Sequence, residues 1–266
     1  MISLLAYVGI GIAALLLYKL DKLTASGMWA ACVVGWLTIA GVGVGGLVVI
    51  AVFFGSSIVW GRLDSSKVDV DVVAKHGARD AWQVLANGGI AGLCSLLAWL
   101  FPGYAAFAFA GFIGSLAGAT ADTWASELGK YSREKPIHLL TLKRVSPGVS
   151  GAVSALGMAA AFAGSFLVAA TAILLWWRYT PLSHIWLLVY SAIGFLANLA
   201  DSLFGAAIQV LYRCPVCGLE TERLNHCGEK TEKIKGYPLA TNDTINFICT
   251  FTGAALGVLA VVLIGP

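Results

Sequence analysis

Apolar residues gather in eight segments along the chain, separated by shorter polar stretches. The segments lie near residues 2–18, 28–43, 44–61, 80–101, 104–122, 148–176, 184–211 and 241–265. Most have about the 20 residues that an α-helix needs to cross a hydrocarbon core of roughly 30 Å. The pattern therefore predicts an all-α polytopic transmembrane helix bundle with about seven to eight spans.

The second and third segments form one continuous apolar stretch from Met28 to Gly61, which is 34 residues long. As a single helix this stretch would measure about 51 Å, which is too long for one ordinary span. The glycine-rich sequence at 41–46 interrupts it. We therefore expect two short or tilted helices that meet at these glycines.

The distribution of basic residues tests this division, because cytoplasmic loops are enriched in Lys and Arg. With eight spans and the N-terminus outside, the inward loops are 19–27, 62–79, 123–147 and 212–240, and they hold 16 of the 17 Lys and Arg residues. A single span over 28–61 would move Lys19 and Lys22 to the opposite side. The charges therefore favour eight spans in the cytoplasmic membrane, with the basic loops in the cytoplasm.

The composition excludes a soluble protein, since 59% of the residues are hydrophobic, only 12% are charged and the mean hydropathy is +0.84. We predict one integral membrane domain over residues 1–266. The first apolar run lacks a preceding basic residue and a small-residue cleavage site, so we expect a retained helix rather than a signal peptide. The net charge of +3 gives no indication of a nucleic-acid partner.

Acidic and amide residues recur at the ends of the apolar segments, where ionisable groups are costly and usually functional. Three clusters stand out: Asp122 with Glu127, Asn198 with Asp201, and Asn242 with Asp243 and Asn246. We expect them to share one polar site. Clustered carboxylates near a membrane surface suit Mg²⁺, which binds one or two carboxylates together with phosphate oxygens.

Each cluster also has a purely structural interpretation. Asp122 would be a helix-end acid solvated by lipid headgroups, and the pair Asn198 and Asp201 would stabilise helix packing. Thr241 or Asn242 would cap the last helix. In addition, Asp122 and Asp201 share an Ala-Asp-Thr/Ser context at an offset of 79 residues. That short match suits either a parallel duplication or the general similarity of Ala-rich helices.

Two further groups of polar residues are candidates for binding. Arg79, Gln83 and Asn87 form a polar stripe at the start of the fourth segment. The basic and hydroxyl residues Lys130, Lys143, Arg144 and Ser150 lie around a Pro- and Gly-containing turn that precedes a helix, a setting that attracts anions. The chain contains neither a P-loop nor a dinucleotide-binding glycine motif before a helix.

The last inward loop contains a potential zinc-binding motif. Cys214 and Cys217 are followed by His226 and Cys227, and these residue types suit tetrahedral Zn²⁺. The adjacent His226 and Cys227 are cramped as simultaneous ligands, so a three-ligand or incidental arrangement is the alternative. The cysteines in the apolar segments are expected only to pack.

The longest motifs resemble those of a known family. The sequences GSLAGATADTWASELG, TLKRVSPGVSGAVSALG and GFLANLADSLFGA and the late ND-x-x-N are similar to those of the membrane-protein family that includes transmembrane protein 19 and the phytyl-phosphate kinases of plants and cyanobacteria. The resemblance covers the chain from about Lys75 to its end. The N-terminal spans are similar only in hydropathy.

The resemblance implies an enzyme that transfers a phosphoryl group from a nucleoside triphosphate, which is CTP in characterised members, to a prenyl monophosphate lipid. For such an enzyme we expect Mg²⁺ to be held by Asp122, Glu127, Asp201 and Asp243, with Asp122, Asp201, Asp243 and Lys130 as the catalytic residues. Nucleotide and phosphate would be bound by Arg79, Gln83, Asn87, Glu127, Lys143, Arg144, Ser150, Asn198, Asn242 and Asn246. The alternative function is a transporter or flippase for a lipid phosphate or small anion, which would need polar groups near the bilayer centre.

Overall fold

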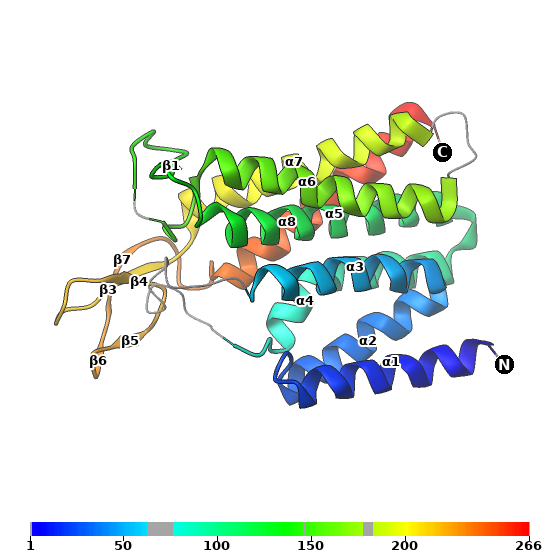
Figure 1. The fold of residues 1–266 in the computed structure, drawn as a ribbon, viewed down its shortest axis with the longest axis horizontal. Helices are drawn as coiled ribbons and strands as arrows, with labels where there is room; N and C mark the ends of the chain where they lie inside the picture. The colour runs from blue at the N-terminus through cyan, green and yellow to red at the C-terminus, as the bar shows by residue number, and fades with distance from the viewer. Residues whose placement is uncertain (1, 63–76, 146, 178–182, 266) are drawn as a thin grey trace.

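The computed structural model describes residues 2–62, 77–145, 147–177 and 183–265, and within these ranges the chain is a bundle of eight α-helices (Figure 1). The helices are α1 (Ile2–Lys19), α2 (Ala25–Gly41), α3 (Val44–Trp60), α4 (Ala81–Leu100), α5 (Ala105–Gly129), α6 (Ala155–Ala172), α7 (Ser183–Ile208) and α8 (Asn242–Ile264). A 3₁₀ turn (Pro102–Tyr104) precedes α5, and a π-helical turn (Ile173–Trp177) follows α6.

Helices α4 to α8 are each long and apolar enough to cross a membrane, and α1 to α3 are shorter apolar helices. The predicted all-α membrane bundle is therefore confirmed. Helix α2 ends at Gly41 and α3 begins at Val44, with Gly43 between them at a φ of +84°. This left-handed conformation favours glycine, which explains why the apolar stretch breaks where the glycines indicated.

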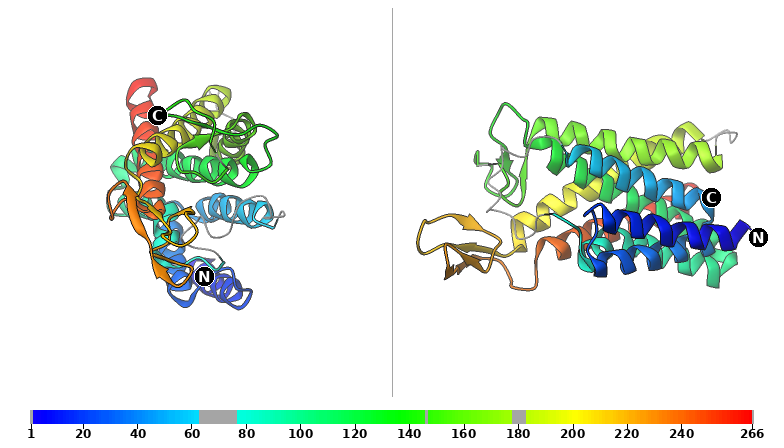
Figure 2. Two further views of the ribbon diagram at one scale, coloured as in Figure 1. Left: turned by 90° about the vertical axis from the view of Figure 1, so that its left-hand side faces the viewer. Right: turned by 60° about the horizontal axis from the view of Figure 1, so that its bottom comes forward.

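Helix α5 is the centre of the bundle and contacts α3, α4, α6, α7 and α8 (Figure 2). Every residue from 110 to 121 is buried. Glycines permit the close contacts, most clearly where Gly114 of α5 crosses Gly253 of α8. A Cβ atom on either residue would collide with the carbonyl oxygen of the other. Small residues at a helix crossing allow the close backbone approach that stabilises helices in lipid.

Two helix boundaries differ from the prediction. Helix α5 continues to Gly129 rather than ending near Asp122, because a helix does not stop where its residues become polar. Helix α6 begins at Ala155 rather than at 148, with Ser154 as its N-cap. Before it, Gly148 and Gly151 adopt φ values of +91° and +79°, which no α-helix tolerates.

Short antiparallel strands, which the hydropathy pattern did not predict, extend beyond the helices. Strands β1 (Ile137–His138) and β2 (Ala152–Val153) pair with each other. Strands β3 (Leu211–Arg213), β4 (Glu220–Thr221) and β7 (Glu232–Lys235) form a three-stranded sheet in the order β4-β3-β7, and β5 (Asn225–His226) pairs with β6 (Glu229–Lys230). We call residues 211–235 the strand region.

The connections that were predicted to face inward lie at one end of the bundle, opposite the two chain termini (Figure 1). The α1–α2 connection, the α5–α6 connection and the strand region all lie there. The predicted inward loop 62–79 falls mainly outside the described residues. Loops that are separated by an even number of spanning helices lie on the same side of a membrane, and the shared position of these connections agrees with that rule. That this side faces the cytoplasm stays a prediction.

Candidate active site

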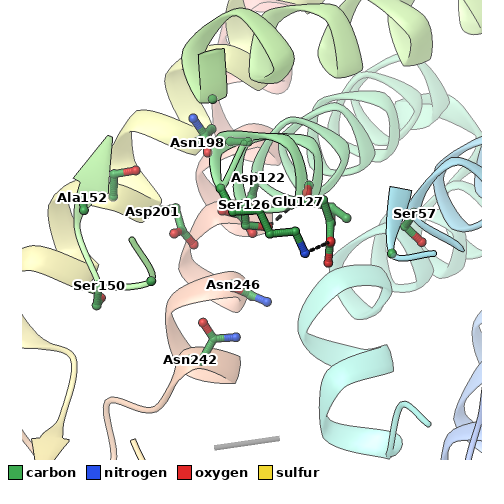
Figure 3. Close-up of a pocket in the computed structure, with 18 of the residues that line it drawn as sticks. Ser57, Asp122, Ser126, Glu127, Ser150, Ala152, Asn198, Asp201, Asn242 and Asn246 are labelled. Atoms are coloured by element: carbon green, nitrogen blue, oxygen red, sulfur yellow. Dashed lines mark hydrogen bonds and ion pairs between the residues drawn. The ribbon is translucent and has the colours of Figure 1, made fainter. Parts of the chain in front are cut away.

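A polar cavity of about 660 Å³ opens at this end of the bundle, where the C-terminal turns of α3, α5 and α7 meet the N-terminal turns of α4, α6 and α8 (Figure 3). Most of the residues that the sequence identified as site candidates line it. They are Arg79, Gln83, Asn87, Asp122, Glu127, Lys130, Ser150, Asn198, Asp201, Asn242 and Asn246. Residues from five separate segments of the chain therefore converge on one cavity.

Asp122 on α5 and Asp201 on α7 form the centre of the cavity wall, and their carboxyl groups hydrogen-bond to each other. Within the described residues, Oδ1 of Asp201 is buried and has no hydrogen-bond partner. Two carboxylates this close repel each other unless a proton or a cation lies between them. The pair, with its unsatisfied oxygen, therefore has the chemistry of a cation site.

Three amide side chains surround the aspartate pair. Asn198 lies one turn before Asp201 and is 2% exposed, and Asn242 and Asn246 project from the first turns of α8 (Figure 3). Thr241, not Asn242, is the N-cap of α8, because its hydroxyl accepts from the Thr244 N–H. Asn242 is thus not needed as a cap. The positive end of the α8 dipole also favours an anion near this wall.

Lys130 and Glu127 form an ion pair with an Nζ–Oε2 distance of 2.6 Å, and their side chains are only 13% and 29% exposed. The pair neutralises both charges at the end of α5. Glu127 would therefore bind a metal ion only by giving up Lys130, so Asp122 and Asp201 suit a metal better.

Arg79 provides positive charge on the opposite side of the cavity. Its Nη1 donates to Ser57 Oγ at 3.1 Å, and its guanidinium lies 4.9 Å from the centre of the Phe54 ring. Its backbone N–H donates to the Lys22 carbonyl, which fixes the segment against the α1–α2 connection. Burial lowers the pKa of Arg79 from its ordinary value and the negative charge of Glu127 opposes that shift, so the guanidinium stays charged.

Gln83 and Asn87 line the cavity but also stabilise the helix that carries them. Asp80 caps α4, and Gln83 Oε1 accepts the Asp80 N–H at 3.1 Å in a capping box. Asn87 Nδ2 donates to the Gln83 carbonyl at 3.0 Å. The Gln83 carboxamide nitrogen and the Asn87 amide oxygen are therefore the atoms suited to a ligand.

The loop at 147–154 is tied to the strand region through two residues that sequence reasoning missed. Ser150 Oγ donates to Gln209 Oε1 at 2.6 Å, and Gln209 Nε2 donates to Glu222 Oε1 at 2.6 Å. Gln209 directly follows the end of α7, eleven residues after Asn198, and this helical offset could have identified it. Glu222 gave no such signal, because a tertiary contact brings it to the cavity.

Two basic residues of the lining, Lys22 and Arg62, were counted only as topology markers. Their positions at the ends of apolar segments, in loops that lie on one side of the membrane in the predicted topology, were the available signal. Conversely, Lys143 and Arg144 are exposed on the α5–α6 connection, where Arg144 pairs with Glu134 at 3.1 Å. The structure does not bring these two residues to the cavity lining.

Asp243 is also absent from the described lining of the cavity. It follows Asn242 on α8, and successive residues of a helix point about 100° apart. Asp243 is half-buried at the edge of the helix face that carries Asn242 and Asn246, but it does not reach the lining. The structure therefore separates Asp243 from the two aspartates with which it was grouped.

The Cys and His residues of the predicted zinc motif do come together in the strand region. One ligand atom from each of Cys214, Cys217, His226 and Cys227 lies within 4.8 Å of the others. This cluster is distinct from the cavity, since none of its members contributes to the cavity lining.

Comparison with known proteins identifies the family. Residues 8–254 match the family described as integral membrane protein DUF92, and the chain belongs to this family. The resemblance seen in the motifs is thereby confirmed. No solved structure matches the chain.

Relatives occur in plants and archaea. Protein PGR of Arabidopsis thaliana is 30% identical over 76% of this chain and 76% of its own. An uncharacterized membrane protein of Methanocaldococcus jannaschii is 31% identical over 93% of this chain and 90% of its own. The chloroplastic protein VTE6 of Arabidopsis thaliana is 29% identical over 70% of this chain and 56% of its own.

Proposed function

We propose that this member of the DUF92 family is a prenyl-phosphate kinase of the cytoplasmic membrane, with its cavity open to the cytoplasm. It would transfer a phosphoryl group from a nucleoside triphosphate, with CTP the expected donor, to a prenyl monophosphate such as phytyl, geranylgeranyl or farnesyl phosphate. One observation carries the proposal: the hydrogen-bonded carboxyl groups of Asp122 and Asp201 in a polar cavity at the end of an apolar bundle.

The charges of the cavity support a phosphate-bearing substrate that arrives with a metal ion. Among the described residues its lining contains four basic side chains, Lys22, Arg62, Arg79 and Lys130, and five acidic ones, Asp21, Asp122, Glu127, Asp201 and Glu222. Acidic groups repel a triphosphate unless a divalent cation joins the two. The basic residues alone would not offset both the acids and the nucleotide.

Magnesium fits the aspartate pair. Mg²⁺ prefers hard oxygen ligands and binds through one or two carboxylates plus phosphate oxygens. Asp122 and Asp201 supply the carboxylates, and the unsatisfied Oδ1 of Asp201 gains a partner when a cation binds. When bound, the ion would neutralise charge on the phosphates during transfer.

The reaction balances without a general base from the protein. An oxygen of the prenyl monophosphate dianion attacks the γ-phosphorus, the bond between γ-phosphorus and the β,γ-bridging oxygen breaks, and the products are the prenyl diphosphate and the nucleoside diphosphate. Because the attacking oxygen is already deprotonated, the protein needs only to position the two substrates and stabilise charge. Arg79 would perform the second task, and Lys130 would do so after exchanging Glu127 for a phosphate oxygen.

The position of the cavity suits one substrate from water and one from lipid. The lining also includes apolar side chains, among them Phe54 and Ile58 of α3 and Met158 of α6. A prenyl phosphate would place its headgroup among the charged residues and direct its chain past this apolar side into the bilayer. Beyond the cavity, α5 is buried continuously from residue 110 to residue 121. That closed core disfavours the alternative of a transporter, which needs access from both faces.

The test is product formation by the purified protein in detergent. It would be assayed with Mg²⁺, each of the four nucleoside triphosphates and each of the three prenyl monophosphates, alongside Asp122→Asn and Asp201→Asn. We expect a prenyl diphosphate with at least one donor, and its loss in both variants. Glu232→Gln, which neutralises an exposed carboxylate of β7, is the matched control.

Absence of turnover with every substrate pair, from protein that is folded and monodisperse, would contradict the kinase. In that case flux of a labelled prenyl phosphate across proteoliposomes would test the transporter. Turnover that persists in both aspartate variants would retain the enzyme but refute the assigned metal ligands.

A further inference from the structure

The cluster of Cys and His side chains in the strand region lies where two tight turns face each other. Cys214 and Cys217 belong to the turn between β3 and β4, whereas His226 is the last residue of β5 and Cys227 follows it in the turn to β6. Nδ1 of His226 lies 3.4 Å from Sγ of Cys217 and 3.2 Å from Sγ of Cys227. Around a tetrahedral zinc with Zn–S and Zn–N bonds of about 2.3 Å and 2.0–2.1 Å, adjacent ligand atoms are about 3.5–3.8 Å apart.

The backbone of the first turn is arranged around the sulfur atoms. The Gly218 N–H donates to the Cys214 carbonyl at 3.0 Å, and the Cys214 N–H donates to the Leu219 carbonyl at 2.9 Å. The backbone N–H groups of Cys217 and Val216 donate to the Cys214 sulfur. Donors directed at a sulfur stabilise the thiolate, which is the form that binds a metal.

The turn after β5 explains how the adjacent residues His226 and Cys227 can both bind one metal ion. Cys227 has a φ of +52° and Gly228 a φ of +81°. Two consecutive left-handed residues between β5 and β6 make a tight turn in which His226 and Cys227 can both approach one centre, whereas in a regular strand they would point to opposite faces. For a residue other than glycine, such as Cys227, this left-handed backbone conformation costs on the order of 1 kcal/mol. Another interaction must therefore offset that cost.

The strand region has few other means of holding this arrangement. Its strands are two to four residues long, and β5 pairs only with β6. Such a small unit buries little apolar surface and commonly depends on a metal or a disulfide. The six cysteines, all within the described residues, form no disulfide, and three cysteines with one histidine match a metal site better than a pair of bridges.

We propose that Cys214, Cys217, His226 and Cys227 bind one Zn²⁺ ion through three sulfur atoms and Nδ1 of the imidazole. The three thiols lose their protons on binding, and the histidine binds as the neutral ring. Four protein ligands leave no open position, so the ion is structural rather than catalytic.

The zinc site would also position one wall of the cavity. Cys214 directly follows β3, and β3 pairs with β4, which ends at Thr221. The next residue, Glu222, accepts the hydrogen bond from Gln209 that links the strand region to the cavity. Loss of zinc therefore releases Glu222 from Gln209 while leaving the helices in place. Glu222 acts here as a positioning residue.

The first experiment measures metal without measuring activity. The full chain would be purified in detergent without chelators, and its zinc content determined by mass spectrometry of the elements. We expect about one zinc per chain, and a loss of at least about tenfold in Cys217→Ser and Cys227→Ser. Cys32→Ser is the matched control, because Cys32 lies in α2 and belongs to no metal cluster among the described residues.

A second measurement covers the case in which the variants fail to fold. Removal of the metal from the wild-type chain and addition of Co²⁺ should give the visible absorption bands of a tetrahedral cobalt–thiolate site. Re-addition of Zn²⁺ should abolish them. Limited proteolysis should then cleave 211–235 faster in the metal-free form than in the zinc form, with the helices protected in both.

Three outcomes would overturn the proposal: wild-type protein without zinc that gains no cobalt bands, iron at the same stoichiometry, or a disulfide between two of the three cysteines in freshly purified protein. Because none of these readouts uses turnover, failure of the zinc site and failure of the kinase are separate results.

Discussion

The carboxyl groups of Asp122 and Asp201 hydrogen-bond to each other although the residues are 79 positions apart in the chain. They lie on neighbouring helices, α5 and α7, whose C-terminal turns end at the same side of the bundle (Figure 1). The shared Ala-Asp-Thr/Ser context is thus matched by a parallel arrangement of the two helices. A duplication as its origin stays a prediction.

Magnesium should stabilise the wild-type protein but not Asp201→Asn. The substitution keeps the size of the side chain, removes one charge and replaces one ligand oxygen by an amide nitrogen that cannot bind Mg²⁺. We expect millimolar Mg²⁺ to raise the melting temperature of the wild-type protein in detergent and to leave that of the variant unchanged. Without the ion, the variant should melt no lower than the wild type, because a carboxylate repulsion is gone.

In an activity assay, Asp201→Asn should have a kcat at least about a hundredfold lower than that of the wild type, which corresponds to a loss of roughly 2.7 kcal/mol of transition-state stabilisation. Glu232→Gln again serves as the control. A variant that still responds to Mg²⁺ like the wild type would place the ion elsewhere in the cavity.

An exchange of side chains should test the link between Ser150, Gln209 and Glu222. Gln209→Glu puts two carboxylates in contact and removes the N–H donor to Glu222, so we expect about a tenfold or greater rise in KM for the nucleotide. Adding Glu222→Gln restores a donor, since the new amide can donate to the carboxylate at 209 while the Ser150 hydroxyl still donates to it.

The double variant Gln209→Glu with Glu222→Gln should therefore recover most of the lost affinity. If the KM of the double variant rises by the product of the two single-variant factors, the two residues act independently. The KM and kcat values of all four proteins give the interaction energy directly.

Gly253→Ala should destabilise the bundle by about 1–3 kcal/mol, because the new methyl group has no room at the α5–α8 crossing. The free energy of unfolding can be measured by titrating SDS into mixed micelles. Gly55→Ala in α3 makes the same chemical change where no atom lies within 4 Å of the added Cβ, and it should be neutral or slightly stabilising. Equal stabilities for the two variants would mean that the helices cross less closely than described.

The α5–α6 connection should lose protection as the pH falls below about 6.5. His138 is 8% exposed, burial lowers its pKa below the ordinary value of 6.5, and the positive charge of Lys235 lowers it further. The unfolded connection then binds more protons than the folded one, so stability is full above the unfolded pKa and declines as the pH falls toward the folded pKa.

Hydrogen exchange of peptides from 131–145, corrected for the intrinsic rate, should therefore be faster at pH 5.5 than at pH 7.5. His138→Gln should abolish most of this difference, because the amide has no proton to gain. Equal protection at the two pH values in the wild type would show that His138 is solvated in both states.

Local sequence patterns were sufficient for the helices and for much of the cavity. Each apolar run satisfies its own backbone hydrogen bonds in lipid, so hydropathy alone locates the spans. Polar residues such as Asp201 and Asn246 are informative because they are costly where they stand. The break at Gly43 follows from a backbone property of one residue.

The features that were missed depend on pairings between distant segments. Short strands such as β3 and β4 have no hydrophobic periodicity long enough to detect. Glu222 reaches the cavity because the strand that precedes it, β4, pairs with β3. The ion pair between Arg144 and Glu134 depends on how a polar connection folds. The ligand spacing of Cys214 and Cys217, in contrast, is encoded within four residues and was visible at once.

The crossing of Gly114 and Gly253 lies far from the cavity, yet it sets the distance across it. Asp122 lies eight residues beyond Gly114 on α5, and Asn246 lies seven residues from Gly253 toward the start of α8, so each is about 10–12 Å from the crossing along its helix. If a larger side chain pushes α5 and α8 apart at this crossing, their ends at the cavity move apart as well. Natural or engineered substitutions in the middle of the membrane can thus abolish activity while every residue of the cavity is retained, and a variant catalogue restricted to the cavity would misclassify them as benign.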